Sequence, residues 1–407
     1  MGRLRIILFC VSFVLVSLNG FLYAQSEGVK NLRLSHYLNY HPERKINPYI
    51  VSQFPDTLYV YAIRIQFKTD NNPNTTGNGR LDLSHNYPDS VDAPPHDSAY
   101  FTHHLEFLKN YYYKSSKGKL IIKYQLLGNV RNLPLEMKDY SPDQSGNLTN
   151  MGRLFFAAWS SVDSVIDFSG VNPSKSAFII FHAGAGRDVD LLSQGIFEGQ
   201  QDIPSIFLGL NSLKSIYGDT TKGYYTREGV IIPGSCILPE QEYRVIESTI
   251  TPFFLELGLN GIIAASIGSN LGLPDLFDTE TGSTAIGRFG LMDGQSLFSY
   301  SGVFPPEPSA WEKQYMGWVN PKIVYSNGTY TSRSASLDDG TGSVYKVYIS
   351  AKEYFLVENR NRDAKKNGET VYYIKNGVPD SMKFTKDIDG FQNGDVWKLK
   401  GDIVNVE

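Results

Sequence analysis

The residues best suited to chemistry lie in one stretch of the chain, residues 261–293. The chain is apolar at roughly helical spacing over residues 249–273, and Gly272 followed by Pro274 is a typical end for a helix. A helical zinc site needs two ligands one turn apart, a general base beside the first, and a glycine where the chain reverses toward a third ligand. In this spacing the glycine falls on Gly272 and the third ligand on Asp275.

The helical ligands and the general base of such a site are missing. The three positions hold Ala265, Ser266 and Ser269. Alanine has no donor atom, and a neutral serine hydroxyl is a poor zinc ligand. A general base typically contributes about 10²- to 10⁴-fold in rate, so its replacement by Ser266 removes proton transfer as well. The spacing of a zinc protease site is present, but its chemistry is not.

Three segments carry a family resemblance, namely AASIGSNLGLPDLFD, IGRFGLMDG and PSAWEKQYMGWV. Together they resemble the immune inhibitor A-type family of secreted metzincin metallopeptidases. The resemblance is strongest over residues 261–319 and extends over roughly residues 55–360. The family pattern is H-E-x-G-H-x-x-G-x-x-D, in which both histidines and the aspartate bind zinc and the glutamate activates water.

Carried onto this chain, the resemblance leaves Asp275 as the only retained ligand position. It makes Gly268 the glycine inside the motif, Gly272 the turn glycine and Met292 the floor of the site, with Asp293 beside it. Zinc is the cofactor of the family, but no cofactor is expected here because two of three protein ligands are gone.

The resemblance also implies a position for His182, which begins a His-Ala-Gly turn after a buried strand and would lie beside the cleft. His182 is the last histidine in the chain, so no later histidine can replace the missing ligands. The implied fold class is α+β: a zincin or metzincin-like domain with a mixed sheet and a central active-site-type helix, followed by a small all-β domain. Strands at 58–67 and 177–181 should form part of the sheet that buries the helix at 264–271.

The chain divides into four predicted regions. Residues 1–24 have the charged start and apolar run of a signal peptide, although an uncleaved anchor is the alternative. Residues 25–55 are a lead-in or a pro-segment, and residues 56–320 are the metallopeptidase-like domain. Residues 321–407 are a C-terminal β domain that ends on an apolar alternating run and could be truncated. These features predict a secreted protein, extracellular or periplasmic.

Composition and charge limit the classes of partner that we expect this chain to bind. The chain has 407 residues, of which 41% are hydrophobic and 13% aromatic, enough for a sizeable core. Its net charge of −4 and pI near 6.0 give no basic field. We therefore expect no nucleic-acid partner, and no membrane partner once the signal is cleaved.

Other reactive residues are interpreted as structural. Without the signal, Cys236 is the only cysteine, and its apolar surroundings favour a buried side chain over a nucleophile. His103 and His104 are adjacent in a predicted helix at 97–112, so they face different ways and are interpreted as solvated or capping. The loop at 69–84 could hold a cation, but plain turns are more common in such loops.

Two functions remain open. The first is a secreted pseudoprotease that binds a peptide or protein. The second is an active secreted metalloendopeptidase with a rearranged metal site, or a hydrolase that uses Cys236, Asp275 or Asp293. The structural alternative is that Asp275 and Asp278 cap the turn after the helix and that Asp293 bonds backbone amides.

Overall fold

The computed structural model describes residues 56–84, 92–143, 146–189, 199–242, 244–246, 253–255, 257–278, 283–337, 341–361, 364–384, 399 and 401–407. The proposed signal peptide and the segment at 25–55 lie outside these residues. The described chain is a mixed α+β fold with one mixed sheet and several small sheets.

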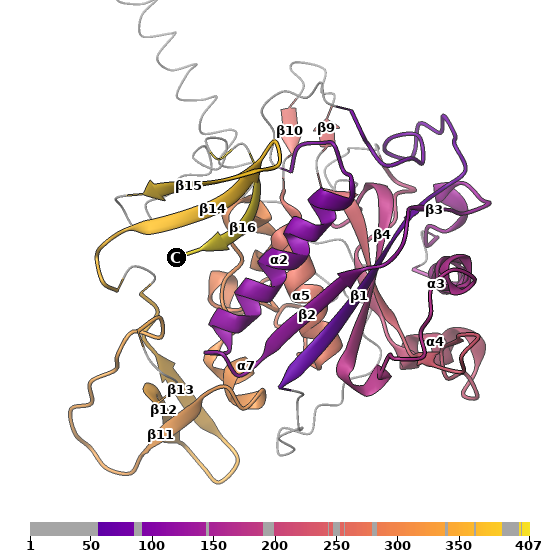
Figure 1. Ribbon diagram of the computed structural model, residues 1–407. Helices are drawn as coiled ribbons and strands as arrows, with labels where there is room; N and C mark the ends of the chain where they lie inside the picture. Colours follow the sequence, from indigo (N-terminus) through magenta and orange to yellow (C-terminus); the bar gives the residue numbers. More distant parts are fainter. Residues whose placement is uncertain are drawn as a thin grey trace, which may run out of the picture.

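The central sheet has the strand order β2-β1-β4-β8-β5 (Figure 1). Its strands are β1 (Thr57–Gln66), β2 (Ile121–Leu126), β4 (Ser176–Ala185), β5 (Ile206–Leu208) and β8 (Ser235–Gln241), with β3 (Arg131–Asn132) paired to the end of β1. Five of these strands run parallel, and β5 is antiparallel to β8 at one edge. The predicted strands at 58–67 and 177–181 are confirmed as β1 and β4.

The family resemblance implies that residues 201–245 form short strands that wall the cleft. Within this segment, β8 is a buried parallel strand inside the sheet. Pro239 made a central strand hard to foresee, because proline cannot donate to a ladder. Strand β5 pairs only with Ser235–Ile237 of β8, so Pro239 lies beyond the reach of that neighbour.

Helices cover both faces of the sheet, as Figure 1 shows. They are α2 (Ser98–Ser115), α3 (Thr149–Asp163), α4 (Leu210–Tyr217) and α5 (Leu259–Leu271). Phe178 and Phe181 of β4 point to opposite faces because side chains alternate along a strand. The ring of Phe178 lies 5.5 Å from Trp159 of α3, and that of Phe181 lies 4.7 Å from Phe101 of α2. Strand β4 is therefore buried on both sides, which explains its unbroken apolar run.

Helix α2 begins as predicted, with Asp97 accepting hydrogen bonds from the amides of Ala99 and Tyr100. The expected exposure is wrong for His104, whereas His103 is partly exposed. His104 is 1% exposed, and its Nδ1 lies 2.8 Å from Oδ1 of Asn260 on α5. His103 Nδ1 lies 2.6 Å from Oδ2 of Asp402. Sequence periodicity did not reveal that α2 is packed on two sides, by α5 and by the end of the chain.

The β-rich region after residue 320 forms two separate sheets. The first contains β11 (Asn320–Val324), β12 (Thr341–Tyr348) and β13 (Tyr354–Glu358), and the second contains β14 (Glu369–Lys375), β15 (Val378–Phe384) and β16 (Asp402–Val406). The second sheet packs against α2. The apolar cluster shared there contains Phe107, Tyr300, Val303, Phe304, Val371, Tyr373, Leu399 and Ile403.

Short elements complete the fold. They are β6 (Tyr224–Tyr225), β7 (Ile231–Ile232), β9 (Arg244–Ile246), β10 (Phe253–Leu255), α6 (Gln295–Phe298) and α7 (Ala310–Tyr315), besides several single turns of 3-10 helix. Helix α7 lies within the predicted helix at 308–319 and starts with a capping box between Ser309 and Glu312.

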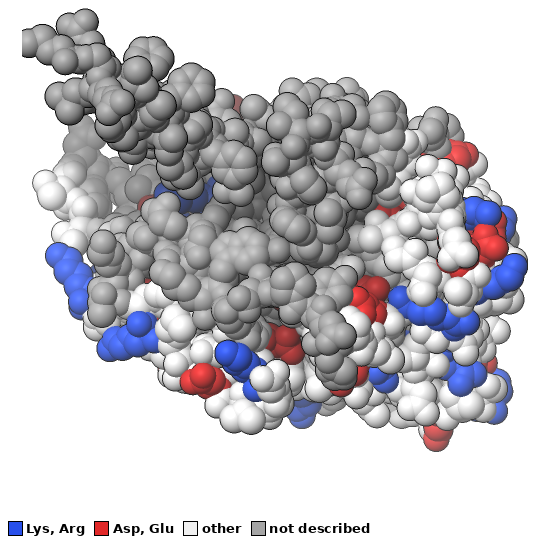
Figure 2. All heavy atoms as spheres, turned by 90° about the horizontal axis from the view of Figure 1, so that it is seen from above, with Lys and Arg blue, Asp and Glu red and all other residues white. Residues whose placement is uncertain are grey.

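The surface shows charges of both signs. In Figure 2, basic and acidic side chains are interspersed over the described part of the face seen from above. Among the described residues, no helix is long and apolar enough to cross a membrane.

Candidate functional site

Helix α5 carries the candidate site and is buried, as predicted for residues 264–271. Its N-terminal half contacts α2, where the Tyr112 hydroxyl donates to the carbonyl of Ala264 at 2.7 Å. On the sheet side, Cys236 of β8 donates from Sγ to the carbonyl of Ser266 at 3.3 Å. Helix α5 is therefore packed between α2 and the sheet, and a hydrogen bond from each side holds its backbone in place.

The helix ends where the glycine spacing predicted. Gly272 adopts a φ of +107°, a left-handed conformation that favours glycine. The Leu273 amide donates to Gly268 O at 2.9 Å, and the Gly272 amide donates to Ser269 O at 3.1 Å. This pair of bonds is the Schellman pattern, which ends a helix and reverses the chain. The reversal brings Asp275 back to the face of the helix that carries Ser266 and Ser269.

Met292 lies directly against the middle of α5. Its carbonyl accepts a hydrogen bond from the Leu276 amide at 2.9 Å. Its Sδ lies 2.6 Å from the point that a Cβ on Gly268 would occupy. A side chain at position 268 would therefore collide with the thioether. Met292 and Gly268 are therefore in close contact, which leaves no space for a side chain at position 268 unless Met292 shifts.

Asp293 is 1% exposed and stabilises the loop at 284–287, which precedes it in the sequence. Its Oδ2 accepts hydrogen bonds from Thr284 Oγ1 at 2.9 Å, and from the amides of residues 285, 286 and 287 at 3.0, 2.9 and 3.2 Å. The expected bonding to backbone amides is thus observed. Its other oxygen, Oδ1, is buried and accepts no hydrogen bond from the described residues.

These residues surround a small cavity of about 50 Å³. The predicted site positions that line it are Ala265, Ser266, Ser269, Asp275, Met292 and Asp293. The remaining lining comes from Ser205, Ile206 and Phe207 beside and on β5, and from Ile262, Phe277, Gly294, Ser296 and Leu297. None of the described residues that line the cavity is a lysine, arginine or histidine.

His182 lies elsewhere. It is fully buried in β4, where its Nδ1 is 2.9 Å from the carbonyl oxygen of Ala183 and its ring is 6.1 Å from that of Phe67. Burial lowers the pKa of His182 to about 4. The residue does not line the cavity, so the structure places it inside the sheet and not at the cleft surface.

The donors present in the cavity do not suit zinc. Two carboxylates and several hydroxyls replace the imidazole and thiolate ligands that zinc prefers. No group of three or more His, Cys, Asp or Glu side chains within the described ranges could hold a metal ion. Cys236 offers no nucleophile, because it is fully buried and burial raises the pKa of its thiol far above the usual range.

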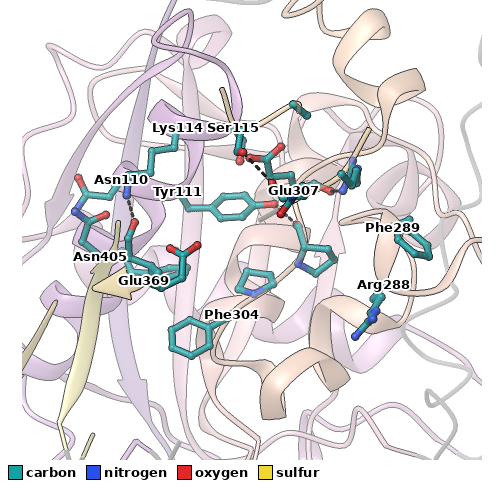
Figure 3. A pocket seen from close by; sticks show the side chains of 18 residues that line it. Asn110, Tyr111, Lys114, Ser115, Arg288, Phe289, Phe304, Glu307, Glu369 and Asn405 are labelled. Atoms are coloured by element: carbon teal, nitrogen blue, oxygen red, sulfur yellow. Dashed lines mark hydrogen bonds between the residues drawn. The ribbon is translucent and has the colours of Figure 1, made fainter. Parts of the chain in front are cut away.

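A second, larger cavity of about 240 Å³ lies between α2, residues 304–307 and β16 (Figure 3). The sequence analysis missed it because its lining comes from widely separated segments. Several of its polar side chains are engaged in joining those segments. The Tyr111 hydroxyl donates to Pro306 O at 2.6 Å, Lys114 Nζ donates to Val406 O, and Arg360 Nη1 donates to Glu307 O at 3.1 Å. These contacts are those of a structural joint.

The comparisons with known proteins assign no family to this chain. No protein-family model matches the chain, and a search of curated proteins finds no match. The loop at 284–287 is the part of the site that sequence reasoning missed.

Proposed function

We propose that this protein is a non-catalytic relative of the immune inhibitor A-type metallopeptidases that binds an extended peptide or protein segment. The observation that carries the proposal is the cavity on α5, which keeps the frame of a zinc protease site but is lined by Ala265, Ser266 and Ser269. The segment at 1–24 supports export of the chain.

The frame supports the family assignment through geometry that the motif requires. A buried helix ends at a left-handed glycine, Asp275 follows three residues later, and Met292 packs beneath Gly268. A mixed sheet with one antiparallel edge strand lies beside the helix. The glycine turn and the position of Asp275 were expected from the spacing of residues 261–293, and the mixed sheet was expected from the family resemblance.

Loss of catalysis follows from the residue types at the site. Asp275 alone cannot fix zinc in the three-ligand cage that lowers the pKa of a bound water to about 7. Ser266 cannot take a proton from water at neutral pH in the way that a carboxylate does. The cavity therefore lacks both the nucleophile and the base of the family reaction.

Peptide binding is supported by the position of β5. Among the described residues, β5 pairs only with β8, so it is an edge strand of the described sheet. The same strand supplies Ile206 and Phe207 to the cavity wall. An extended peptide that adds a strand to this edge would direct alternate side chains toward the cavity.

The test immobilises this protein on a surface and measures the binding of unfolded casein, which serves as an extended chain. We expect saturable retention of casein with no cleavage products. Short peptides from the retained region should bind, and the same peptides with N-methylated backbone amides should not, because strand addition needs those amide donors. Equal binding of the methylated peptides would contradict binding at the β5 edge.

A further inference from the structure

The larger cavity, between α2, residues 304–307 and β16, is not filled by the side chains that join those elements. Its volume is about 240 Å³ (Figure 3). An apolar cavity of about 150 Å³ can hold benzene, so this one has room for an aromatic ring and a short polar arm. Among the described residues, it shares no lining residue with the cavity on α5. A ligand in it would therefore be independent of the proposed peptide binding.

Part of the lining is apolar and aromatic. The residues of this part include Phe107, Phe289, Pro305, Pro306, Ala335 and Val406. The rings of Phe107 and Tyr111 are stacked with their centres 6.1 Å apart, which gives α2 an aromatic surface at the cavity. Phe289 is 57% exposed, so contact with a ligand would remove apolar surface from water.

Two charged side chains of the lining already have close partners of opposite charge. Glu307 Oε2 lies 3.0 Å from Lys313 Nζ, and Arg360 Nε lies 2.8 Å from Glu358 Oε2. A charge that is paired in this way gains little from a ligand of opposite charge. These two pairs therefore shape the cavity without deciding which ligand it takes.

Lys114 retains donors that the contacts between α2 and β16 do not use. Its Nζ donates to Val406 O, and among the described residues no carboxylate forms an ion pair with it. An ammonium has three donors, so Lys114 can donate to a further acceptor in the cavity. Burial lowers the pKa of Lys114, and Glu407 and Glu369 oppose this shift from longer range. A carboxylate in contact with Nζ would oppose it more strongly, because Coulomb attraction rises as the distance falls.

We propose that the larger cavity binds a small amphipathic carboxylate, with its carboxylate group at Lys114 and its apolar part against Phe107 and Phe289. Such a ligand would contact α2, residues 304–307 and β16 together, because all three contribute to the lining. Only the folded chain brings these elements to one place. Binding should therefore stabilise the folded state.

The first experiment measures the affinity of the full chain for three probes by isothermal titration calorimetry. The probes are 3-phenylpropionate, 3-phenylpropionamide and 3-phenylpropylamine. The acid should bind about tenfold more tightly than the amide, as expected for a hydrogen bond between charged groups, and the amine should bind most weakly. Lys114→Gln should remove the preference for the acid. Lys352→Gln, at an exposed residue outside the cavity, should leave it unchanged.

Phe289→Ala provides an independent variant in case Lys114→Gln disturbs the contact between α2 and β16. Because Phe289 is exposed, its truncation should leave the fold intact while it weakens the acid and the amide alike. Unchanged affinity for both probes would place the ligand elsewhere and overturn the proposal.

Three other outcomes of the titrations would also overturn it. They are no saturable binding of the acid, equal affinity for acid and amide, and an acid preference that survives Lys114→Gln. Tighter binding of the amine would contradict it as well, and would point to a carboxylate of the lining such as Glu369. None of these results bears on peptide binding at the other cavity, so the two proposals fail separately.

A second experiment tests whether the ligand binds the joined elements. Saturating 3-phenylpropionate should raise the urea midpoint of unfolding of the natural chain, and the amide at the same concentration should raise it less. The difference between the two should disappear in Lys114→Gln. Equal midpoints of the natural chain with and without the acid would contradict binding to the folded state.

Discussion

Ser266 and Ser269 are 8% and 6% exposed and lie one helical turn apart on the cavity face of α5. In the resembled motif, Ser269 stands at the position of a zinc ligand and Ser266 at the position of the general base. The surrounding residues that shape those positions, Gly268 and Gly272, keep their structural roles. At the residue scale, the proposed loss of catalysis lies in side-chain identity and not in a change of backbone.

The triple change Ala265→His, Ser266→Glu and Ser269→His should therefore create a zinc site. Two imidazoles one turn apart would join Asp275, which already follows the glycine turn. We expect about one zinc per chain by mass spectrometry of the dialysed variant. Adding Asp275→Ala to the triple variant is the matched control and should weaken zinc binding. A triple variant that binds no zinc would show that α5 does not present these positions as the motif requires.

His182 gives a pH dependence of stability. Burial lowers its pKa from 6.5 to about 4 in the folded chain, so between these values the unfolded chain binds the proton and the folded chain does not. Its contribution to stability is complete above pH 6.5 and is lost as pH falls toward 4. Relative to His182→Gln, the natural chain should lose about 2 kcal/mol of unfolding free energy between pH 7 and pH 5 in urea titrations. Parallel pH profiles for the two proteins would contradict this assignment.

At the scale of elements, the position of α5 is fixed by close contacts on several sides. Its sequence is apolar nearly all round, as expected for a helix packed against α2, β8 and β5. The fit with Met292 depends on the absence of a side chain at Gly268. The same contact ties the helix to the chain segment that contributes Asp293 to the cavity.

Gly268→Ala should destabilise the protein by about 1–3 kcal/mol, because the added methyl group meets Met292 Sδ. Met292→Ala should relieve part of that cost, which a double-mutant cycle of urea unfolding would detect. Gly170→Ala is the matched control, because nothing lies within 4 Å of its added Cβ. Additive effects of the Gly268 and Met292 changes would argue against their contact.

The sequence predicted the elements whose pattern is local. The apolar runs of β1 and β4, the Asp97 cap of α2 and the Gly272 end of α5 are each encoded within a few neighbouring residues. It did not predict β8, because Pro239 obscures a strand whose neighbours are known only from the fold. It also misjudged His104, since its partner Asn260 is 156 residues away in sequence. The cavity was only partly predictable, because its β5 wall comes from a segment with no motif.

At the scale of the whole molecule, the last strand is joined to a helix far from it in sequence. Strand β16 packs against α2, and His103 and Asp402 connect the two. Ile403 and Tyr373 share one apolar cluster with Phe107 of α2. We therefore expect the second C-terminal sheet to unfold together with the central sheet.

Ile403→Ala tests this coupling. The change should cost about 2–5 kcal/mol, because a buried side chain is truncated in the shared cluster. Urea unfolding followed by tryptophan fluorescence and by circular dichroism should keep a single coincident transition, shifted to lower urea. Ile349→Ala, at a side chain 60% exposed, should shift it little. Separate transitions by the two probes would show that the C-terminal sheet unfolds independently.

The most direct test of the account is the zinc content and proteolytic activity of the natural sequence. The purified protein is incubated with zinc, dialysed, analysed for metal and then assayed on casein, with the zinc-loaded triple variant measured for metal in parallel. We predict far less than one zinc per chain and no cleavage, because Ala265, Ser266 and Ser269 supply neither ligands nor a base. One zinc per chain, with casein hydrolysis that a chelator abolishes, would contradict the non-catalytic assignment.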